Sequence, residues 1–82
     1  MRIAVVSMVL DDPREVQGRV NEVIASYKSI VKGRMGIPLN EEDVSVISLA
    51  VIGENDEINA LTGKLGAIDK VNVKTSFSKK EI

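Results

Sequence analysis

The segment Asp11-Asp-Pro-Arg14 is the part of the chain whose residue types could do chemistry. It follows an apolar run and opens a helical pattern, so it places two carboxylates, an arginine and exposed backbone N–H groups at the start of a helix. Such a cluster suits a small polar ligand, with Asp12 and Arg14 as the effector-binding residues. Helix capping explains part of the same pattern without a ligand, because Asp12 fits an N-cap, Pro13 a first helical residue and Glu15 a capping-box carboxylate.

Other motifs carry less chemistry. Gly63-Lys-Leu-Gly66 has the spacing of the GxxG loop with which KH domains clamp a nucleic-acid backbone, but a strand pattern follows it and Leu65 belongs to an apolar stripe. Glu41-Glu42-Asp43 could hold a hard cation, yet it lacks the alternating ligand spacing of a calcium loop. The serines of the predicted strands have no histidine to activate them, so a serine nucleophile has no base.

The composition removes most enzyme chemistry. The chain contains no Cys and no His, which excludes thiolate nucleophiles, imidazole bases and the usual ligands of zinc, nickel and iron–sulfur sites. No pair of side chains can be assigned acid and base roles, so we expect no catalytic residues, no metal and no cofactor. The net charge is −1, from 11 basic and 12 acidic residues, so no overall field attracts nucleic acid.

The length sets the organisation of the chain. Its 82 residues have room for a single domain, residues 1–82, which buries only about 60% of its unfolded surface and would gain stability by associating with another copy. The apolar run at residues 3–10 meets Asp11 without a small-residue cleavage site, so it resembles a strand rather than a signal peptide. We therefore expect a cytoplasmic protein without a membrane partner.

The hydrophobic pattern changes between strand and helix periods. It predicts strands at residues 3–9, 30–35, 44–52 and 71–77, a first helix at residues 13–26, and a second helix that is capped by Asn55-Asp-Glu57 and carries Ile58, Leu61, Leu65 and Ile68 on its apolar stripe. Residues 36–43 are expected to form a polar loop, Gly66 to end the second helix in the left-handed conformation, and residues 78–82 to be a frayed tail. The order predicts an α+β fold, the ferredoxin-like βαββαβ two-layer sandwich, with two helices on one face of a four-stranded antiparallel sheet.

The first and third strands are central in this fold, and both are apolar on both faces. A central strand with one solvated face should instead alternate apolar and polar residues. We therefore expect the sheet face away from the helices to bind another copy of the chain, as a homodimer or larger, with Val46, Ser48 and Ala50 in the interface. Association through a β edge is the other arrangement that we expect of such an oligomer. The alternative explanation of these residues is β propensity alone.

Five blocks spread over nearly the whole chain carry a resemblance in combination. They are Arg19-Val-Asn-Glu-Val-Ile24, Arg34-Met-Gly-Ile-Pro38, Asn40-Glu-Glu-Asp43, Leu61-Thr-Gly-Lys-Leu-Gly66 and Val71-Asn-Val-Lys-Thr75. Together they resemble the iron-only hydrogenase system regulators. The resemblance implies a small stand-alone ACT-like domain, related in fold to the C-terminal domain of the nickel-responsive repressor. We expect such a module to bind a small effector or a hydrogenase-system protein and to transmit that state through its oligomer.

Two departures limit what the resemblance implies. ACT domains that bind amino acids typically have Asp-x-Pro-Gly after the first strand, whereas Arg14 stands at the glycine position here. The nickel repressor binds metal through His and Cys, which this chain lacks, and we find no segment expected to form a DNA-binding domain. The alternative function is a DNA-binding transcriptional regulator acting directly, but the basic residues are scattered among acidic ones, so we expect no nucleic-acid partner.

Overall fold

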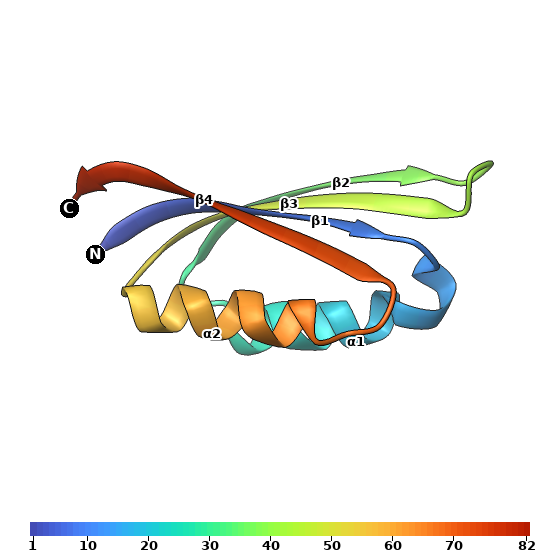
Figure 1. Cartoon of the computed structure of the whole chain (residues 1–82), viewed down its shortest axis with the longest axis horizontal. Helices are drawn as coiled ribbons and strands as arrows, with labels where there is room; N and C mark the ends of the chain where they lie inside the picture. Colours follow the sequence, from blue (N-terminus) through green and yellow to red (C-terminus); the bar gives the residue numbers. More distant parts are fainter.

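The computed structural model describes all 82 residues and has the predicted βαββαβ order (Figure 1). The elements are β1 (Arg2–Leu10), α1 (Pro13–Ser26), β2 (Val31–Leu39), β3 (Val44–Gly53), α2 (Asn55–Gly66) and β4 (Val71–Glu81). The strands form one antiparallel sheet in the order β2-β3-β1-β4, and both helices lie on the same face of it. The predicted ferredoxin-like α+β sandwich, with β1 and β3 at its centre, is confirmed.

The core lies between the sheet and the helix layer, because every second residue of the central strands points toward the helices. α1 and α2 each contribute an apolar stripe spaced by three or four residues. Removing these side chains from water is the main stabilising contribution to the fold. The most deeply buried members are Val6, Met8, Leu10, Leu49 and Val51 from the strands and Val20, Ile58, Leu61 and Leu65 from the helices. Neither helix is long and apolar enough to cross a membrane.

The edge strand β2 is longer than predicted. It continues to Leu39, so the loop expected at residues 36–43 is wrong for its first half, and the turn is confined to residues 40–43. Pro38 lies opposite Ser45 of β3. Proline is tolerated there because an edge strand has one side without a partner, and the missing N–H can face water. Asp43 has a φ of 56°, the left-handed conformation that closes this turn.

The C-terminal residues are also strand rather than a frayed tail. β4 extends to Glu81, which lies opposite Arg2 of β1. The Arg2 guanidinium lies over the Phe77 ring, 4.9 Å from its centroid, and donates a hydrogen bond to the Ser78 carbonyl oxygen at 2.8 Å. The two chain ends therefore lie at the same end of the sheet (Figure 1). The sequence pattern did not predict the last part of β4, because the residues after Phe77 are polar and show no apolar alternation. Polar residues are accepted there because β4 is an edge strand.

The helix ends differ from the predictions in detail. The Asp12 side chain forms no capping hydrogen bond at the start of α1, so the predicted capping box is wrong. At α2 the N-cap is Glu54, one residue before the predicted Asn55, and the Glu57 carboxylate accepts the Glu54 N–H at 3.0 Å. No glycine has a positive φ, so the left-handed end predicted at Gly66 is wrong too.

One glycine is required by close packing. A Cβ at Gly53 would lie 2.9 Å from Cγ2 of Ile30, closer than side-chain carbons approach. Ile30 is buried, and its carbonyl oxygen accepts the N–H of Ile52 at 2.9 Å. The end of β3 is thus fixed by the segment that leads into β2.

Hydrogen exchange tests the strand order. The amides of β1 and β3 should exchange most slowly, because both strands have hydrogen-bonded neighbours on each side and cover the core. Exchange measured residue by residue by NMR checks this. Slower exchange in β2 or β4 than in the central pair would contradict the topology.

Candidate functional site

The acidic residues at the β1–α1 junction are held by a lysine that the sequence did not indicate. Lys70, which precedes β4, pairs with the Glu15 carboxylate, and its Nζ lies 3.5 Å from the carboxylate of Asp12. Asp11 donates its N–H to the Lys70 carbonyl at 2.8 Å and accepts a hydrogen bond from the Asn72 amide at 3.2 Å. These carboxylates therefore fasten the start of β4 to the start of α1.

The same contacts explain the titration of Lys70. Its hydrogen bond to Glu15, then the negative charges of Glu15 and Asp12, raise the pKa of Lys70 above its ordinary value. Lys70 also adopts the left-handed conformation, with a φ of 69°. Sequence spacing could not place it here, because only the return of the chain after α2 brings it to the junction.

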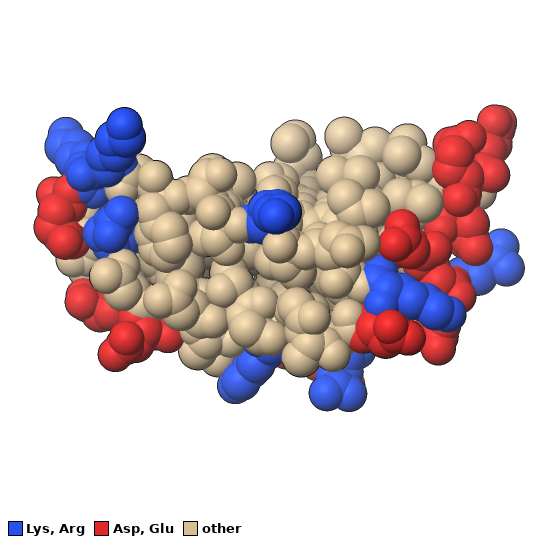
Figure 2. Space-filling model, viewed as in Figure 1, with Lys and Arg blue, Asp and Glu red and all other residues tan.

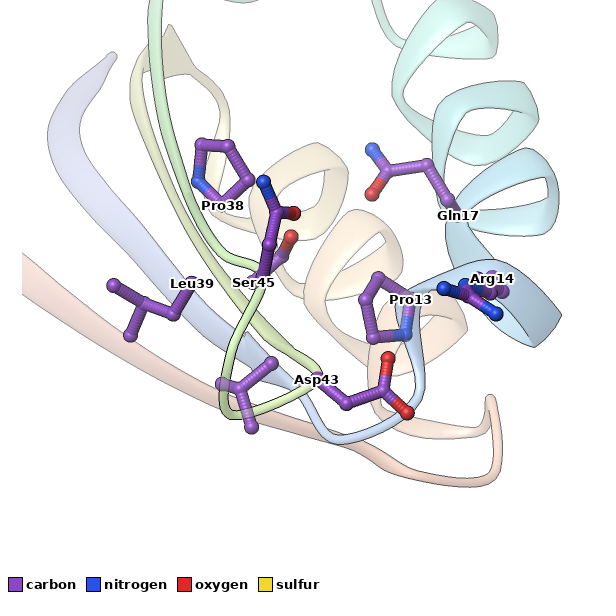
Figure 3. Close-up of a pocket in the computed structure, with 9 residues that line it drawn as sticks. Pro13, Arg14, Gln17, Pro38, Leu39, Asp43 and Ser45 are labelled. Atoms are coloured by element: carbon purple, nitrogen blue, oxygen red, sulfur yellow. The ribbon is translucent and has the colours of Figure 1, made fainter.

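The Arg14 side chain does not join Asp12 and Lys70 but lies in a neighbouring cleft. It forms no ion pair and lines a cleft of about 410 Å³ between the start of α1 and the β2–β3 turn (Figure 3). Gln17 extends into this cleft from α1, and the Asp43 carboxylate points from the turn toward the start of α1. The two residues predicted to bind an effector together are thus placed apart: Asp12 with Lys70, and Arg14 in the cleft.

The cleft continues beneath β2. A second hollow of about 260 Å³ shares Gln17, Pro38 and Ser45 with the first and extends to Arg34. Arg34 donates a hydrogen bond to the Asn21 side-chain oxygen of α1 at 2.7 Å. We call the two hollows together, from Arg14 to Arg34, the α1–β2 groove.

The sheet surface away from the helices, here called the open face, holds the three predicted interface residues. Val46, Ser48 and Ala50 follow one another at every second position of β3, and all point to this face. Their β2 partners are Ile37, Met35 and Gly33, respectively. The Met35 side chain is 62% exposed and that of Ile37 is 51% exposed. The open face is therefore an extensive apolar surface in contact with solvent.

The sequence analysis missed the β2 part of the open face. Met35, Ile37 and Leu39 alternate as a strand should, but Gly36 and Pro38 between them favoured a loop. On β1, Val5 and Val9 continue the same surface and are 45% and 37% exposed. A shallow hollow of about 250 Å³ lies at its centre, where Gly33 and Ala50 leave space beside Met35.

Charged groups are nearly absent from the open face. The register places Asn72, Lys74 and Ser76 of β4 there, and Lys74 is the one charged residue among the paired positions of this face. Figure 2 shows that charged side chains gather at the two ends of the molecule and along the helices, with a single basic side chain over the middle.

No group of acidic side chains anywhere in the protein is arranged to hold a metal ion.

Comparison with known proteins identifies the family. Residues 2–75 match the TM1266-like family, described as "Iron-only hydrogenase system regulator, putative". The chain belongs to this family. Its structure is similar to that of the uncharacterized protein TM1266 from Thermotoga maritima, with a TM-score of 0.91 and 36% identity, over 95% of this chain and 98% of that one. No curated protein matches. The resemblance carried by the five sequence blocks is confirmed.

Replacing Lys70 with methionine tests the ion pairs at the junction. The pKa of Lys70 is higher in the folded state than in the unfolded chain, where it has its ordinary value of 10.5. The ion pairs of Lys70 therefore contribute their full stability below pH 10.5, and this contribution is lost as the pH rises through the folded-state pKa. Urea unfolding should show Lys70→Met less stable than wild type at neutral pH, with the difference shrinking above pH 10.5. Methionine keeps the aliphatic stem, so the difference reports the charge.

Lys28→Met is the matched control, because Lys28 is exposed and forms no ion pair. It should leave the stability close to that of wild type throughout the same pH range. A loss of stability in Lys70→Met that is unchanged at high pH would contradict the electrostatic account.

Proposed function

We propose that this TM1266-like regulator is not an enzyme and works as a homo-oligomeric module of an iron-only hydrogenase system. It transmits the binding of a small effector, or of a protein of that system, through its assembly in the cytoplasm. The observation that carries the proposal is the open face, an apolar surface on the two central strands and on β2.

The chemistry of the open face favours a second copy of the chain as its occupant. The part formed by β2, β3 and β1 carries no charged residue at its paired positions, so the same surface on two copies can be buried together without desolvating an ion. Gly33 and Ala50 leave a hollow next to the protruding Met35. A two-fold arrangement can place the Met35 of one copy over the hollow of the other, because an isologous interface is self-complementary.

The polar groups of the junction support a structural or binding role rather than catalysis. Lys70 pairs with Asp12 and Glu15 at the surface, and the raised pKa of Lys70 keeps it protonated and tied to them. Arg14 is free to meet an anionic group, which keeps it in the proposal as an effector-binding residue. Asp12 then contributes by holding Lys70 and the first turn of α1 in place.

The geometry of the basic residues disfavours direct DNA binding. Arg34 is hydrogen-bonded to Asn21 of α1, and the Lys32 ammonium donates to the Ser29 carbonyl at 3.1 Å. Lys74 is the basic residue left on the open face. A sheet that docks on a nucleic-acid backbone needs several phosphate contacts on one surface.

Two glutamate substitutions on the open face, with a third on α2 as their control, test the oligomer. Ala50→Glu would bury an unpaired carboxylate in the proposed interface and should shift the protein to a monomer of 8.9 kDa in sedimentation at micromolar concentration. Val46→Glu should do the same. Ala60→Glu, on the exposed side of α2, makes the same change away from the sheet and should leave the assembly intact. Wild-type protein sedimenting as a monomer would contradict the proposal.

Titration with hydrogenase-promoter DNA separates the two regulatory classes. The wild-type oligomer should bind weakly, without sequence selectivity, and the binding should disappear as salt approaches the physiological concentration. Fluorescence anisotropy with promoter and scrambled duplexes measures this. Submicromolar binding that prefers the promoter would support the direct DNA-binding regulator instead.

A further inference from the structure

The α1–β2 groove exists because the inner side of β2 has too little side-chain volume to close against α1. The inward positions there are Arg34, Gly36 and Pro38, and every residue of β2 from Lys32 to Leu39 is exposed. The two hollows of the groove, about 410 Å³ and 260 Å³, together fall within the range of small-molecule sites.

The floor of the groove holds a serine whose hydroxyl has no partner within the protein. Ser45 is the one buried polar side chain of the protein, with 8% of its surface exposed, and it lines both hollows. It occupies an inward position of β3, in series with the apolar Ile47 and Leu49. Its hydroxyl has no hydrogen-bond partner within the protein. The hydroxyl is not cut off from solvent, so it opens into the groove and can donate a hydrogen bond to a ligand there.

The groove walls are cationic at both ends. On α1, Arg14, Gln17 and Asn21 follow one another at intervals of three and four residues, so their side chains lie on the same side of the helix over roughly 10 Å. Arg14 lies at one end of this row, and Asn21 at the other end holds Arg34 by a hydrogen bond. The Arg14 guanidinium has no carboxylate partner. At the mouth, the Asp43 carboxylate can accept a hydrogen bond from a donor on the ligand (Figure 3).

We propose that the α1–β2 groove binds a small organic anion of metabolite size, a carboxylate or a phosphate ester. Its oxyanion pairs with Arg14, its body lies toward Arg34, and it accepts a hydrogen bond from Ser45. This inference rests on the effector role proposed above and moves the site from the Asp12–Arg14 pair to the groove.

The placement of Ser45 also gives the ligand a route to the assembly. Ser45 and Val46 are consecutive in β3, so one points into the groove and the other to the open face. β2 is likewise shared, with Pro38 in the groove and Ile37 on the open face. A ligand that fixes the spacing of α1 and β2 therefore acts on the strands that would meet the second copy.

Titration of ¹⁵N-labelled full-length protein with succinate, AMP and inorganic phosphate tests the site. We expect saturable shifts of the backbone amides of Gln17, Gly36 and Ser45. Binding of succinate alone assigns a carboxylate, whereas binding of AMP or inorganic phosphate assigns a phosphate group. Binding of none of the three at tens of millimolar overturns the proposal.

Charge reversal on α1 provides the first matched pair of variants. Arg14→Glu should weaken binding of the active probe at least about tenfold, since a charged hydrogen bond is lost. Arg19→Glu makes the same change on an exposed position of the same helix, outside the groove, and should leave binding within about twofold. Equal binding by the two variants overturns the proposal.

Glycine replacements provide the second pair. A Cβ at Gly36 would lie 3.9 Å from Ile47 inside the groove, so alanine fits the fold there and narrows the groove. Gly18 is exposed on α1 and outside the groove, and a Cβ there meets no atom within 4 Å. Gly36→Ala should weaken ligand binding with the oligomer retained, and Gly18→Ala should leave both unchanged.

The two proposals fail separately. Probe shifts that map outside the groove overturn the site alone, whereas a wild-type monomer overturns the proposed oligomeric function whatever the probes do.

Discussion

The pairing of β1 with β3 is the constraint on which the rest of the structure depends. The two strands are antiparallel from Arg2 opposite Gly53 to Leu10 opposite Ser45. Side chains alternate strictly along a strand, so a slip of one residue would turn the core residues to solvent. The same register that buries Val6 and Leu49 beneath the helices exposes Val5 and Ala50 on the other side. The core and the open face are therefore two consequences of one pairing.

The two candidate surfaces lie on opposite sides of β2 and β3, and this arrangement suits a regulator. The groove needs β2 to be an edge strand that the helices do not close, and the open face needs the same strand to carry Met35 and Ile37 outward. The alternating Gly36 and Pro38 give the groove its width, while the residues between them supply apolar surface. A ligand that binds the groove more tightly in one arrangement of this strand favours the same arrangement of the open face.

Most of the fold could be predicted from the sequence because the hydrophobic period is strong in the segments that pack against other elements along their whole length. β1, β3 and α1 are long segments with one dominant period. The errors fall where tertiary pairing decides: β2 continues through Pro38 because its outer edge is free, and β4 continues through polar residues because Arg2 and Met1 pair with them. The residues of the candidate site could be predicted only in part. Arg14 and Val46 stood out by type, whereas Lys70 and Ser45 acquire their roles from chain segments distant in sequence.

The most direct test of the account is an isotope-filtered NOE measurement on an oligomer assembled from labelled and unlabelled copies. The account predicts contacts between protomers from the methyl groups of Val5, Ile37 and Val46, with none from the exposed sides of α1 and α2. Contacts between protomers that arise from the helices, with the open-face methyl groups still in water, would contradict it.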